Sequence, residues 1–332
     1  MYPLVSVITP CYNMEGYIHM LLDSILVQTY PTIEMFVIDD GSTDRSVEIV
    51  KRYTEKFNQK GYSLHCILQN RGGQSVAIKR GLTLIQGKYL VWPDADDYYN
   101  NENAISEMVE TLERASHDVK MVRTQERLVE DYTLKEVKIN GTNAKELEQE
   151  SLFEDCLYGN NDFYYCSGAY MVDVNALFEL TGFEIYTDKY AGQNWQIMLP
   201  ILYSYRCMTI LKPYYTVVCR NNSHSRGQYT GYEETHRKYM AYYKTLINTL
   251  DIIKKIPQSD KKRYVSQLKS KYNKLFFKTA VKYGKNEMVC HYYGILKADD
   301  CVKATERFFY VLSRMRILHP LSWMFRIVNQ TV

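Results

Sequence analysis

Residues 33–44 read IEMFVIDDGSTD, which is the most informative stretch for the class of fold. Its first six residues are mostly β-branched or bulky and apolar, which predicts a buried strand from Ile33 to Ile38. The acidic pair Asp39 and Asp40 stands at the end of that strand. The hydroxyl of Ser42 or of Thr43 is expected to cap a helix that follows directly.

The same order of strand and helix repeats on both sides of this stretch. Further strands are predicted at Leu4–Ile8, Ser63–Leu68 and Tyr89–Trp92, and helices at Glu15–Gln28 and near Gln74–Ile85. Strand and helix therefore alternate four times, which is typical of a mainly parallel sheet covered on both faces. Ligands of such sheets bind at the carboxyl ends of the strands.

The pattern is less regular after this alternation. We expect a helix at Ala104–Arg114 and strands near Val119–Arg123, Leu134–Ile139, Phe163–Val172 and Cys207–Leu211. These strands are expected to complete the sheet of an α/β domain.

The chain becomes rich in lysine and tyrosine from about Tyr232 to Arg316, with apolar residues at helical spacing. We expect an α/β domain at residues 1–228 and a helical C-terminal region at residues 229–332, either peripheral to a membrane or related to the acceptor. The segment from Phe308 to Phe325 mixes bulky apolar residues with arginines, which fits a helix lying on a membrane surface. A plain packing helix is the alternative.

The composition is that of a globular protein, with 46% hydrophobic and 24% charged residues among 332. A net charge of +3 gives no reason to expect nucleic acid as a partner. The eight cysteines stand singly, without the spacing of a zinc or redox motif, so we expect buried, reduced thiols. We expect no signal peptide and no membrane span, and therefore a cytoplasmic protein, with the inner face of the cell membrane as the alternative location.

Two carboxylates, Asp94 and Asp96, follow the strand at Tyr89–Trp92. Carboxylates one residue apart suit a hard divalent cation that is also bound by substrate phosphates. An isolated Asp-x-Asp would more simply be a solvated turn. Here the pair formed by Asp39 and Asp40 ends a neighbouring strand and is expected to face the same crevice, which favours a binding site.

Asp40 can accept a hydrogen bond from the imide N–H of uracil, which would select uridine among the nucleosides. The alternative is that Asp40 and Ser42 only form a turn and a helix cap. Pro10 to Asn13 follow the first strand and supply backbone and an aromatic side chain to the same crevice. Tyr12 could stack on the base, or be simply half-buried.

Four segments carry a resemblance to a known family: residues 5–13, 24–30, 37–44 and 94–97. They resemble family 2 glycosyltransferases of the GT-A fold, a Rossmann-like mixed sheet that binds nucleotide-diphosphate sugars. The resemblance is strong over residues 3–100, weaker to about 225 and absent beyond.

The resemblance implies an inverting transfer of a sugar from a nucleotide-diphosphate sugar, with Mg²⁺ or Mn²⁺ as cofactor. It implies that Asp40 contacts the base, that Asp96 binds the metal, and that Asp94 lies on the side of the ribose and metal. The residues expected to contact the nucleotide sugar are Pro10, Tyr12, Asn13, Glu15, Asp40, Lys79, Asp94, Ala95 and Asp96.

The chain departs from the family at two places. Many members carry an Ala-Arg-Asn triplet where this chain has Ala77-Ile78-Lys79, so the positive charge would come from Lys79, Arg80 or Arg71. Gln193 and Asn194 stand where the family usually has Glu-Asp, whose aspartate is the general base.

Amide side chains such as Gln193 and Asn194 do not accept a proton at neutral pH, and three explanations remain open. The base could come from elsewhere, with Asp188, Glu184 and Asp162 as candidates. The nucleophile of the acceptor could already be a phosphate or carboxylate oxygen. Or the chain could bind a sugar nucleotide without turning it over. In an active enzyme we expect Asn194 to orient the acceptor and Asp188 to be the first candidate for the base.

Residues 218–226 resemble the family's segment that closes over the diphosphate. This places His224 as a possible third metal ligand beside Asp94 and Asp96, and Arg220 or Arg226 as a phosphate clamp. A basic surface loop is the alternative.

The sequence thus predicts a hexosyl- or N-acetylhexosaminyltransferase that adds one sugar, from a UDP-sugar, to a glycan or lipid-linked acceptor. Bacterial capsule, exopolysaccharide or lipopolysaccharide synthesis is the expected setting. A non-catalytic subunit that binds sugar nucleotides is the alternative. A nucleotidyltransferase of related fold is disfavoured because residues 9–13 hold no glycine to cradle a triphosphate.

Overall fold

The computed structural model describes residues 2–143, 150–190, 192–220 and 229–315. The chain divides into two compact units. The first, here called the sheet unit, comprises residues 1–221 and 248–256; the second, the helical unit, comprises residues 222–247 and 257–332. The boundary predicted between residues 228 and 229 stays a prediction.

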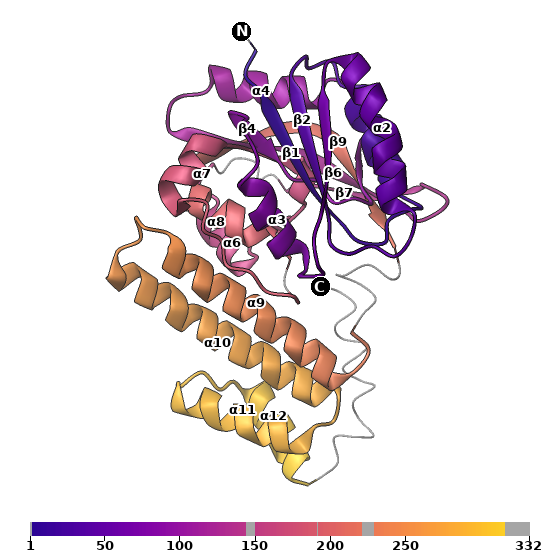
Figure 1. Ribbon diagram of the computed structural model, residues 1–332. Helices are drawn as coiled ribbons and strands as arrows, with labels where there is room; N and C mark the ends of the chain where they lie inside the picture. The colour runs from indigo at the N-terminus through magenta and orange to yellow at the C-terminus, as the bar shows by residue number, and fades with distance from the viewer. Residues whose placement is uncertain (1, 144–149, 191, 221–228, 316–332) are drawn as a thin grey trace. The chain divides into compact units, whose positions relative to one another are not determined.

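The first half of the sheet is parallel, as the sequence predicts. It consists of β1 (Val5–Cys11), β2 (Ile33–Asp39), β3 (Ser63–Leu68) and β4 (Tyr89–Val91). They lie in the order β3-β2-β1-β4, so that β1 pairs with both β2 and β4 (Figure 1). Strand β1 is buried along its whole length, and its carboxyl end therefore lies between those of β2 and β4.

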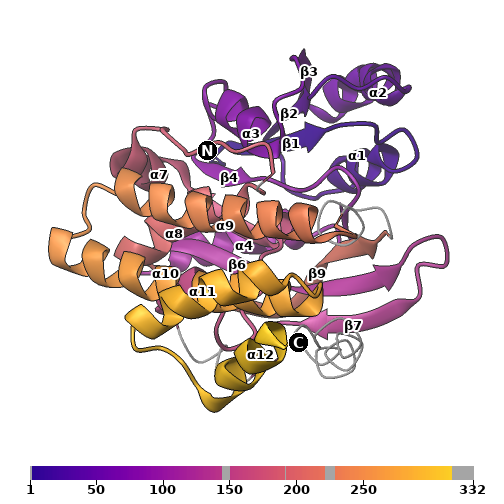
Figure 2. The ribbon, with the colours of Figure 1, turned by 90° about the horizontal axis from the view of Figure 1, so that it is seen from below.

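The second half of the sheet is largely antiparallel, which local periodicity did not reveal. It consists of β5 (Tyr98–Tyr99), β6 (Val119–Glu130), β7 (Glu136–Asn140), β8 (Tyr170–Asp173) and β9 (Arg206–Cys219). Strand β8 pairs antiparallel with β4 and β6, whereas β6 and β9 are parallel. Strands β6 and β7 form a hairpin that extends beyond the rest of the sheet (Figure 2). The sheet is therefore mixed.

The strand predicted from Phe163 begins only at Tyr170. A 3-10 turn at Ser167–Ala169 precedes it. Gly168 lies so close to the ring of Tyr215 that an added Cβ would stand 2.1 Å from it. This close approach holds the turn against β9 and brings Ser167 toward the end of β4.

The helices of the sheet unit pack against these strands and against one another. They are α1 (Ile18–Leu26), α2 (Ser46–Lys60), α3 (Gln74–Leu82), α4 (Ala104–Arg114), α6 (Phe153–Tyr158), α7 (Val174–Thr181) and α8 (Asn194–Ser204). Helix α4 has the predicted bounds. Helix α3 packs against β1 and β2, which sets its N-terminus beside their carboxyl ends.

The predicted cap of α2 is wrong. The helix begins at Ser46, and its first N–H donates to the carboxylate of Asp44, 2.9 Å away. The hydroxyl of Ser42 instead accepts a hydrogen bond from the N–H of Asn13. Ser42 and Thr43 therefore join two loops rather than start a helix.

The helical unit consists of most of α9 (Tyr232–Ile252) with α10 (Gln258–Lys282), α11 (Asn286–Ala298) and α12 (Ala304–Arg314). Helix α10 packs on α11, and α11 on α12. Aromatic side chains fill its interior, where the ring of His236 lies 4.8 Å from that of Phe276. Within the described part of the chain, we find no helix with the length and apolar character needed to cross a membrane.

Candidate active site

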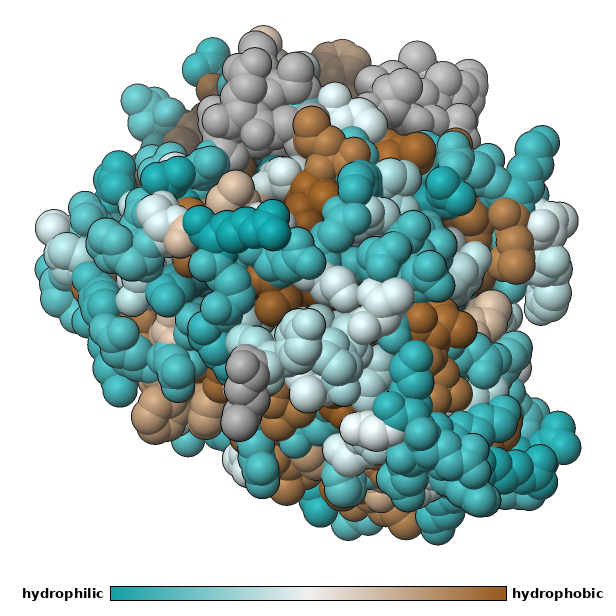
Figure 3. Space-filling view, turned by 90° about the horizontal axis from the view of Figure 1, so that it is seen from above, coloured by the Kyte–Doolittle hydropathy of each residue, from teal (hydrophilic) through white to brown (hydrophobic). Residues whose placement is uncertain are grey.

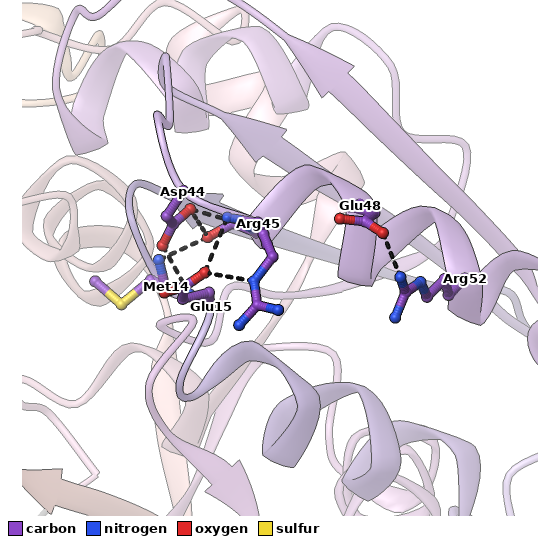
Figure 4. A network of polar contacts seen from close by, with 7 residues as sticks. Met14, Glu15, Asp44, Arg45, Glu48 and Arg52 are labelled. Atoms are coloured by element: carbon purple, nitrogen blue, oxygen red, sulfur yellow. Dashed lines mark hydrogen bonds and ion pairs between the residues drawn. The ribbon is translucent and has the colours of Figure 1, made fainter.

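The loops after β1 and β2 are bonded to each other through side chains (Figure 4). The amide oxygen of Asn13 accepts from the N–H of Thr43 at 2.8 Å. The N–H of Glu15 donates to Asp44 at 3.0 Å, and the carboxylate of Glu15 pairs with Arg45 at 3.1 Å. Asn13 adopts a positive φ of 52°, which asparagine tolerates better than most residues. The predicted contacts Asn13 and Glu15 thus build the rim of the site, and their contact with a nucleotide stays a prediction.

Asp40 is buried beside this rim and organises the start of α3. Its carboxylate accepts three hydrogen bonds of 2.7 Å, from the side chain of Gln69 and from the N–H groups of Gly72 and Gly73. Gly73 has a φ of 96°, a conformation that favours glycine. A carboxylate offers about four acceptor positions, so one is left for a ligand donor such as an imide N–H.

One carboxylate oxygen of Asp39 also lacks a hydrogen-bond donor within the described residues, which the sequence did not indicate. Its Oδ2 accepts from the N–H groups of Gly41 and Ser42, at 3.2 and 3.1 Å. Its Oδ1 is buried and, within the described residues, has no hydrogen-bond partner. A buried acceptor without a donor is costly, so this atom is a second candidate to meet a nucleoside.

Asp94 lies at the end of β4 and is surrounded by neutral donors. Its Oδ2 accepts from the hydroxyl of Ser167 at 3.0 Å, and its Oδ1 accepts from the amide of Gln193 at 2.9 Å. Burial, and then the charge of Asp96, raise the pKa of Asp94 to about 7. Burial is the larger cause, so these surroundings disfavour the charged form of Asp94.

Asp96 is paired with Arg220, which follows the end of β9. The guanidinium places Nε 2.7 Å from Oδ2 of Asp96 and covers the ring of Tyr17 at 4.9 Å. The hydroxyl of Tyr17 donates to Asp131, and burial followed by this bond raises the pKa of Tyr17 to about 12. The predicted clamp Arg220 is thus brought to the carboxylates, whereas His224 and Arg226 lie outside the described residues.

Asp97 fixes the strand that carries Arg220. Its carboxylate is buried and accepts from the N–H of Val218 at 2.9 Å. Burial, and then the charge of Asp96, raise the pKa of Asp97 well above its ordinary value. Because Val218 precedes Arg220 by two residues, this bond holds the guanidinium near Asp96.

Asp94 and Asp96 fit the divalent cation that the sequence predicts. Carboxylates are suitable ligands, and a bound cation would offset the burial and the charge of Asp96 that disfavour the charged form of Asp94. Among the described residues, no group of three or more His, Cys, Asp or Glu side chains is gathered as a metal cage. The pair therefore suits a cation completed by oxygens of a substrate, the common arrangement for Mg²⁺.

Asn194 is bonded on both sides of its amide. Its oxygen accepts from the indole N–H of Trp92 at 3.0 Å, and its nitrogen donates to the carbonyl of Tyr165 at 2.5 Å. An aspartate here could accept from Trp92 but could not donate to Tyr165. Asn194 thus positions Trp92, two residues before Asp94, and its predicted contact with an acceptor stays a prediction.

Gln193 carries a buried acceptor directly beside Asp94. Its side chain is 2% exposed, and its amide nitrogen donates to Asp94. Its Oε1 has no hydrogen-bond partner within the described residues. The sequence marked Gln193 only as a residue that cannot be a base, although its place before Asn194 was a signal that it faces the site.

Asp188 lies beside the N-terminus of α3. Its backbone N–H donates to the hydroxyl of Ser75, 2.9 Å away, and its carboxylate accepts from the N–H of Tyr190. Ser75 adjoins Gln74, whose amide lies 3.5 Å from Asp94. The partly buried Asp188 is therefore joined through Ser75 to the start of α3, beside Gln74, and its role as a base stays a prediction.

The remaining residues that were predicted to bind the nucleotide sugar contact other groups of the protein or are buried. Lys79 forms an exposed ion pair with Glu184 at 2.7 Å. The guanidinium of Arg71 covers the ring of Tyr12 at 3.9 Å and donates to its hydroxyl, so an incoming base would have to share or replace this contact. Pro10 and Ala95 are buried.

One hollow of the described surface lies away from these carboxylates. It has a volume of about 610 Å³ and is lined by one side of α4 together with Met208. None of the carboxylates discussed above lines it. We therefore do not include this hollow in the candidate site.

Solved structures share the fold. A structure of Staphylococcus aureus TarS, residues 1–349, in complex with UDP-GlcNAc superposes with a TM-score of 0.61 at 19% identity, covering 98% of this chain and 92% of that one. A mannosyltransferase from Pyrobaculum calidifontis, in complex with GDP-Man and Mn²⁺, superposes with a TM-score of 0.54 at 16% identity, covering 97% and 87%. The predicted GT-A fold is thereby confirmed.

Sequence relatives are bacterial glycosyltransferases. The putative teichuronic acid biosynthesis glycosyltransferase TuaG of Bacillus subtilis is 35% identical over 113 residues, which are 34% of this chain and 44% of that protein. Aligned segments span 14% to 44% of the curated relatives at 31% to 41% identity. The sequence model of glycosyl transferase family 2 matches residues 6–178, more than half of the chain. The chain belongs to glycosyl transferase family 2.

Proposed function

We propose that this protein is an inverting glycosyltransferase that moves one sugar from a UDP-sugar to a glycan or lipid-linked acceptor. Synthesis of a bacterial surface polysaccharide is the proposed setting. The observation that carries the proposal is the meeting of Asp94, Asp96 and Arg220 at the end of β4. Family membership, the name of TuaG and the UDP-GlcNAc bound to TarS support it.

The proposed nucleoside site lies at the ends of β1 and β2. Asp40 has one acceptor position left after its three donors, and Asp39 has a buried oxygen without a partner in the described chain. The imide N–H of uracil matches either acceptor, and cytosine offers no such imide. Tyr12 and Arg71 would form one wall of this site.

The diphosphate would lie between the carboxylates and Arg220. Asp94 and Asp96 would hold Mg²⁺ or Mn²⁺, which as a Lewis acid would stabilise negative charge on the departing diphosphate. Arg220 presents a planar guanidinium suited to two phosphate oxygens. Its anchor to Asp97 through Val218 keeps it near the leaving group.

The acceptor half of the reaction needs a base for a hydroxyl nucleophile. Asp188 is the proposed base, because it is a partly buried carboxylate held beside Gln74. It would take the proton as the hydroxyl oxygen attacks the anomeric carbon and the bond to the diphosphate breaks, which inverts that carbon. Gln193 would accept a hydrogen bond from a hydroxyl or amide N–H of the donor sugar through its free Oε1.

A screen of nucleotide sugars for release of the nucleoside diphosphate tests this proposal. The protein would be given Mn²⁺, a lipid-linked acceptor pool and each donor in turn. We expect release of UDP from one hexose or N-acetylhexosamine donor and an inverted anomeric configuration in the product by NMR. A product of retained configuration would contradict the proposed displacement.

A non-catalytic subunit that binds sugar nucleotides is the second candidate. The bonding of Asn194 favours it, because both ends of that amide are used by Trp92 and Tyr165. Calorimetry that detects UDP-sugar binding, together with silence in every acceptor assay, would support this candidate over the enzyme.

A further inference from the structure

The net charge of the chain changes sign near residue 256. Residues 1–256 hold 26 Lys and Arg against 33 Asp and Glu, a net charge of −7. Residues 257–332 hold 15 Lys and Arg against 5 Asp and Glu, a net charge of +10. Because the overall charge is only +3, this asymmetry is hidden in the composition. A strongly basic segment attracts anionic surfaces.

Helix α12, within this basic segment, exposes a row of apolar side chains. Phe308, Val311 and Met315 are 57%, 53% and 60% exposed. Their spacing of three and four residues places them on one side of the helix. The buried residues Glu306 and Ser313 mark the other side, which faces the interior of the helical unit.

Arginines flank the row. Arg307 and Arg314 are both exposed, and Lys303 precedes the helix on the surface. Helix α10 of the same unit carries further exposed lysines at a spacing of four residues, Lys278 and Lys282. The exposed side of α12 therefore combines large apolar groups with cations, which is the composition of helices that lie in the interface of a lipid bilayer.

We propose that the exposed side of α12 binds the surface of an anionic lipid bilayer. Phe308, Val311 and Met315 would enter the boundary between headgroups and acyl chains, and Arg307 and Arg314 would meet lipid phosphates. A polyanionic glycan would match the charge but would leave the apolar row in water. A bilayer satisfies both features. The face of the protein seen in Figure 3 differs from this exposed side of α12, because its hydrophobic residues are interspersed among hydrophilic ones.

This proposal is independent of the proposed chemistry. It requires no nucleotide, metal or acceptor, and it holds whether or not the protein turns over a sugar nucleotide. Where both hold, the bilayer would bring the enzyme to a lipid-linked acceptor. Failure of one would leave the other intact, because the first is measured with empty vesicles and the second by UDP release.

Flotation of the full chain with vesicles tests the proposal. Phosphatidylcholine vesicles with and without phosphatidylglycerol would be compared, at low and high salt. We expect binding only to the phosphatidylglycerol vesicles and weaker binding as salt rises. A chain that does not float with anionic vesicles, or floats equally with neutral ones, would overturn the proposal.

Substitutions locate the surface. Phe308→Ser with Val311→Ser should lower the partition onto anionic vesicles by about tenfold or more, since most apolar area of the row is lost. The matched control is Val137→Ser with Leu211→Ser, two apolar residues of similar exposure in the sheet unit. The control should bind as the native chain does, and circular dichroism should show all variants folded.

Two other occupants of the row give different results. If a second copy covers it, Phe308→Ser with Val311→Ser would convert a dimer into a monomer in ultracentrifugation without vesicles. If the segment after residue 315 covers it, the same variant would increase hydrogen exchange in residues 316–332 without vesicles. If either result is seen and the variant still binds vesicles as the native chain does, the proposal that the row binds lipid is overturned.

Discussion

The guanidinium of Arg220 lies on the carboxylate of Asp96, with Nε 2.7 Å from Oδ2. The two residues are separated by 124 positions in the chain, and both are largely buried, with side chains 16% and 15% exposed. This contact joins the end of β9 to the acidic turn after β4. A cation that binds Asp96 therefore has to compete with the guanidinium of Arg220.

Arg220→Gln should therefore raise the affinity for metal and at the same time lower turnover. Without the guanidinium, Asp96 is freed, and Mn²⁺ affinity in the absence of nucleotide should rise by about tenfold. The kcat/KM for the donor should fall by about 10- to 100-fold because a phosphate contact is lost. Manganese titration by electron paramagnetic resonance and UDP release measure the two effects. Arg206→Gln, which removes an exposed ion pair with Asp118, is the control and should change neither.

Asn194→Asp should not create a better enzyme. The new carboxylate would face the carbonyl of Tyr165, to which Asn194 now donates. Loss of this bond should lower the free energy of unfolding by about 1–3 kcal/mol, measured by urea denaturation. The exposed Asn103→Asp is the matched control. A variant with native stability and higher turnover would show that position 194 still serves as the base of the family.

Asp94→Asn should change how stability depends on pH. The pKa of Asp94 is raised from 3.8 to about 7, so between these values the folded protein holds a proton that the unfolded chain has released. Stability of the native protein in EDTA should fall as pH rises through this window, and this loss should be absent in the variant. Thermal melts at pH 4 and pH 8 check it. If the two proteins respond alike, the pKa of Asp94 is not raised in the folded protein.

Gln193→Met should weaken recognition of the donor sugar. The substitution keeps a side chain of similar length but removes the donor to Asp94 and the free Oε1. Because a lost hydrogen bond to a sugar group costs about 1–3 kcal/mol, kcat/KM should fall by about 5- to 150-fold. UDP itself should bind with native affinity in calorimetry. Equal losses for UDP and the UDP-sugar would place Gln193 at the nucleotide instead.

The first half of the fold was predictable because its information is local. Runs of β-branched and apolar residues predicted the strands β1 to β4, helical spacing of apolar residues predicted the helices between them, and the acidic residues at the strand ends indicated a candidate site. The antiparallel half was not predictable in this way. The length of β9 and the late start of β8 depend on pairing with distant segments, such as the approach of Gly168 to Tyr215.

The contacts within the site are long-range and explain what the sequence missed. Gln193 and Asp94 are 99 residues apart, and Asn194 and Trp92 are 102 apart. No periodicity joins such positions, so the free oxygen of Gln193 and the bonding of Asn194 appear only in three dimensions. Residue types still indicated Asp40, Asp94 and Asp96 as candidates, because the carboxyl ends of neighbouring parallel strands lie at one edge of the sheet.

In the proposed reaction, Asp94 and Asp96 form a metal-dependent donor site. Release of UDP by the native protein, by Asp96→Asn and by the surface control Asp118→Asn, each with Mn²⁺ and with EDTA, tests it most directly. We expect turnover by the native protein and the control, loss of about 100-fold or more in Asp96→Asn, and the same loss in EDTA. Full activity of folded Asp96→Asn with Mn²⁺ would contradict the assignment of Asp96 to the metal.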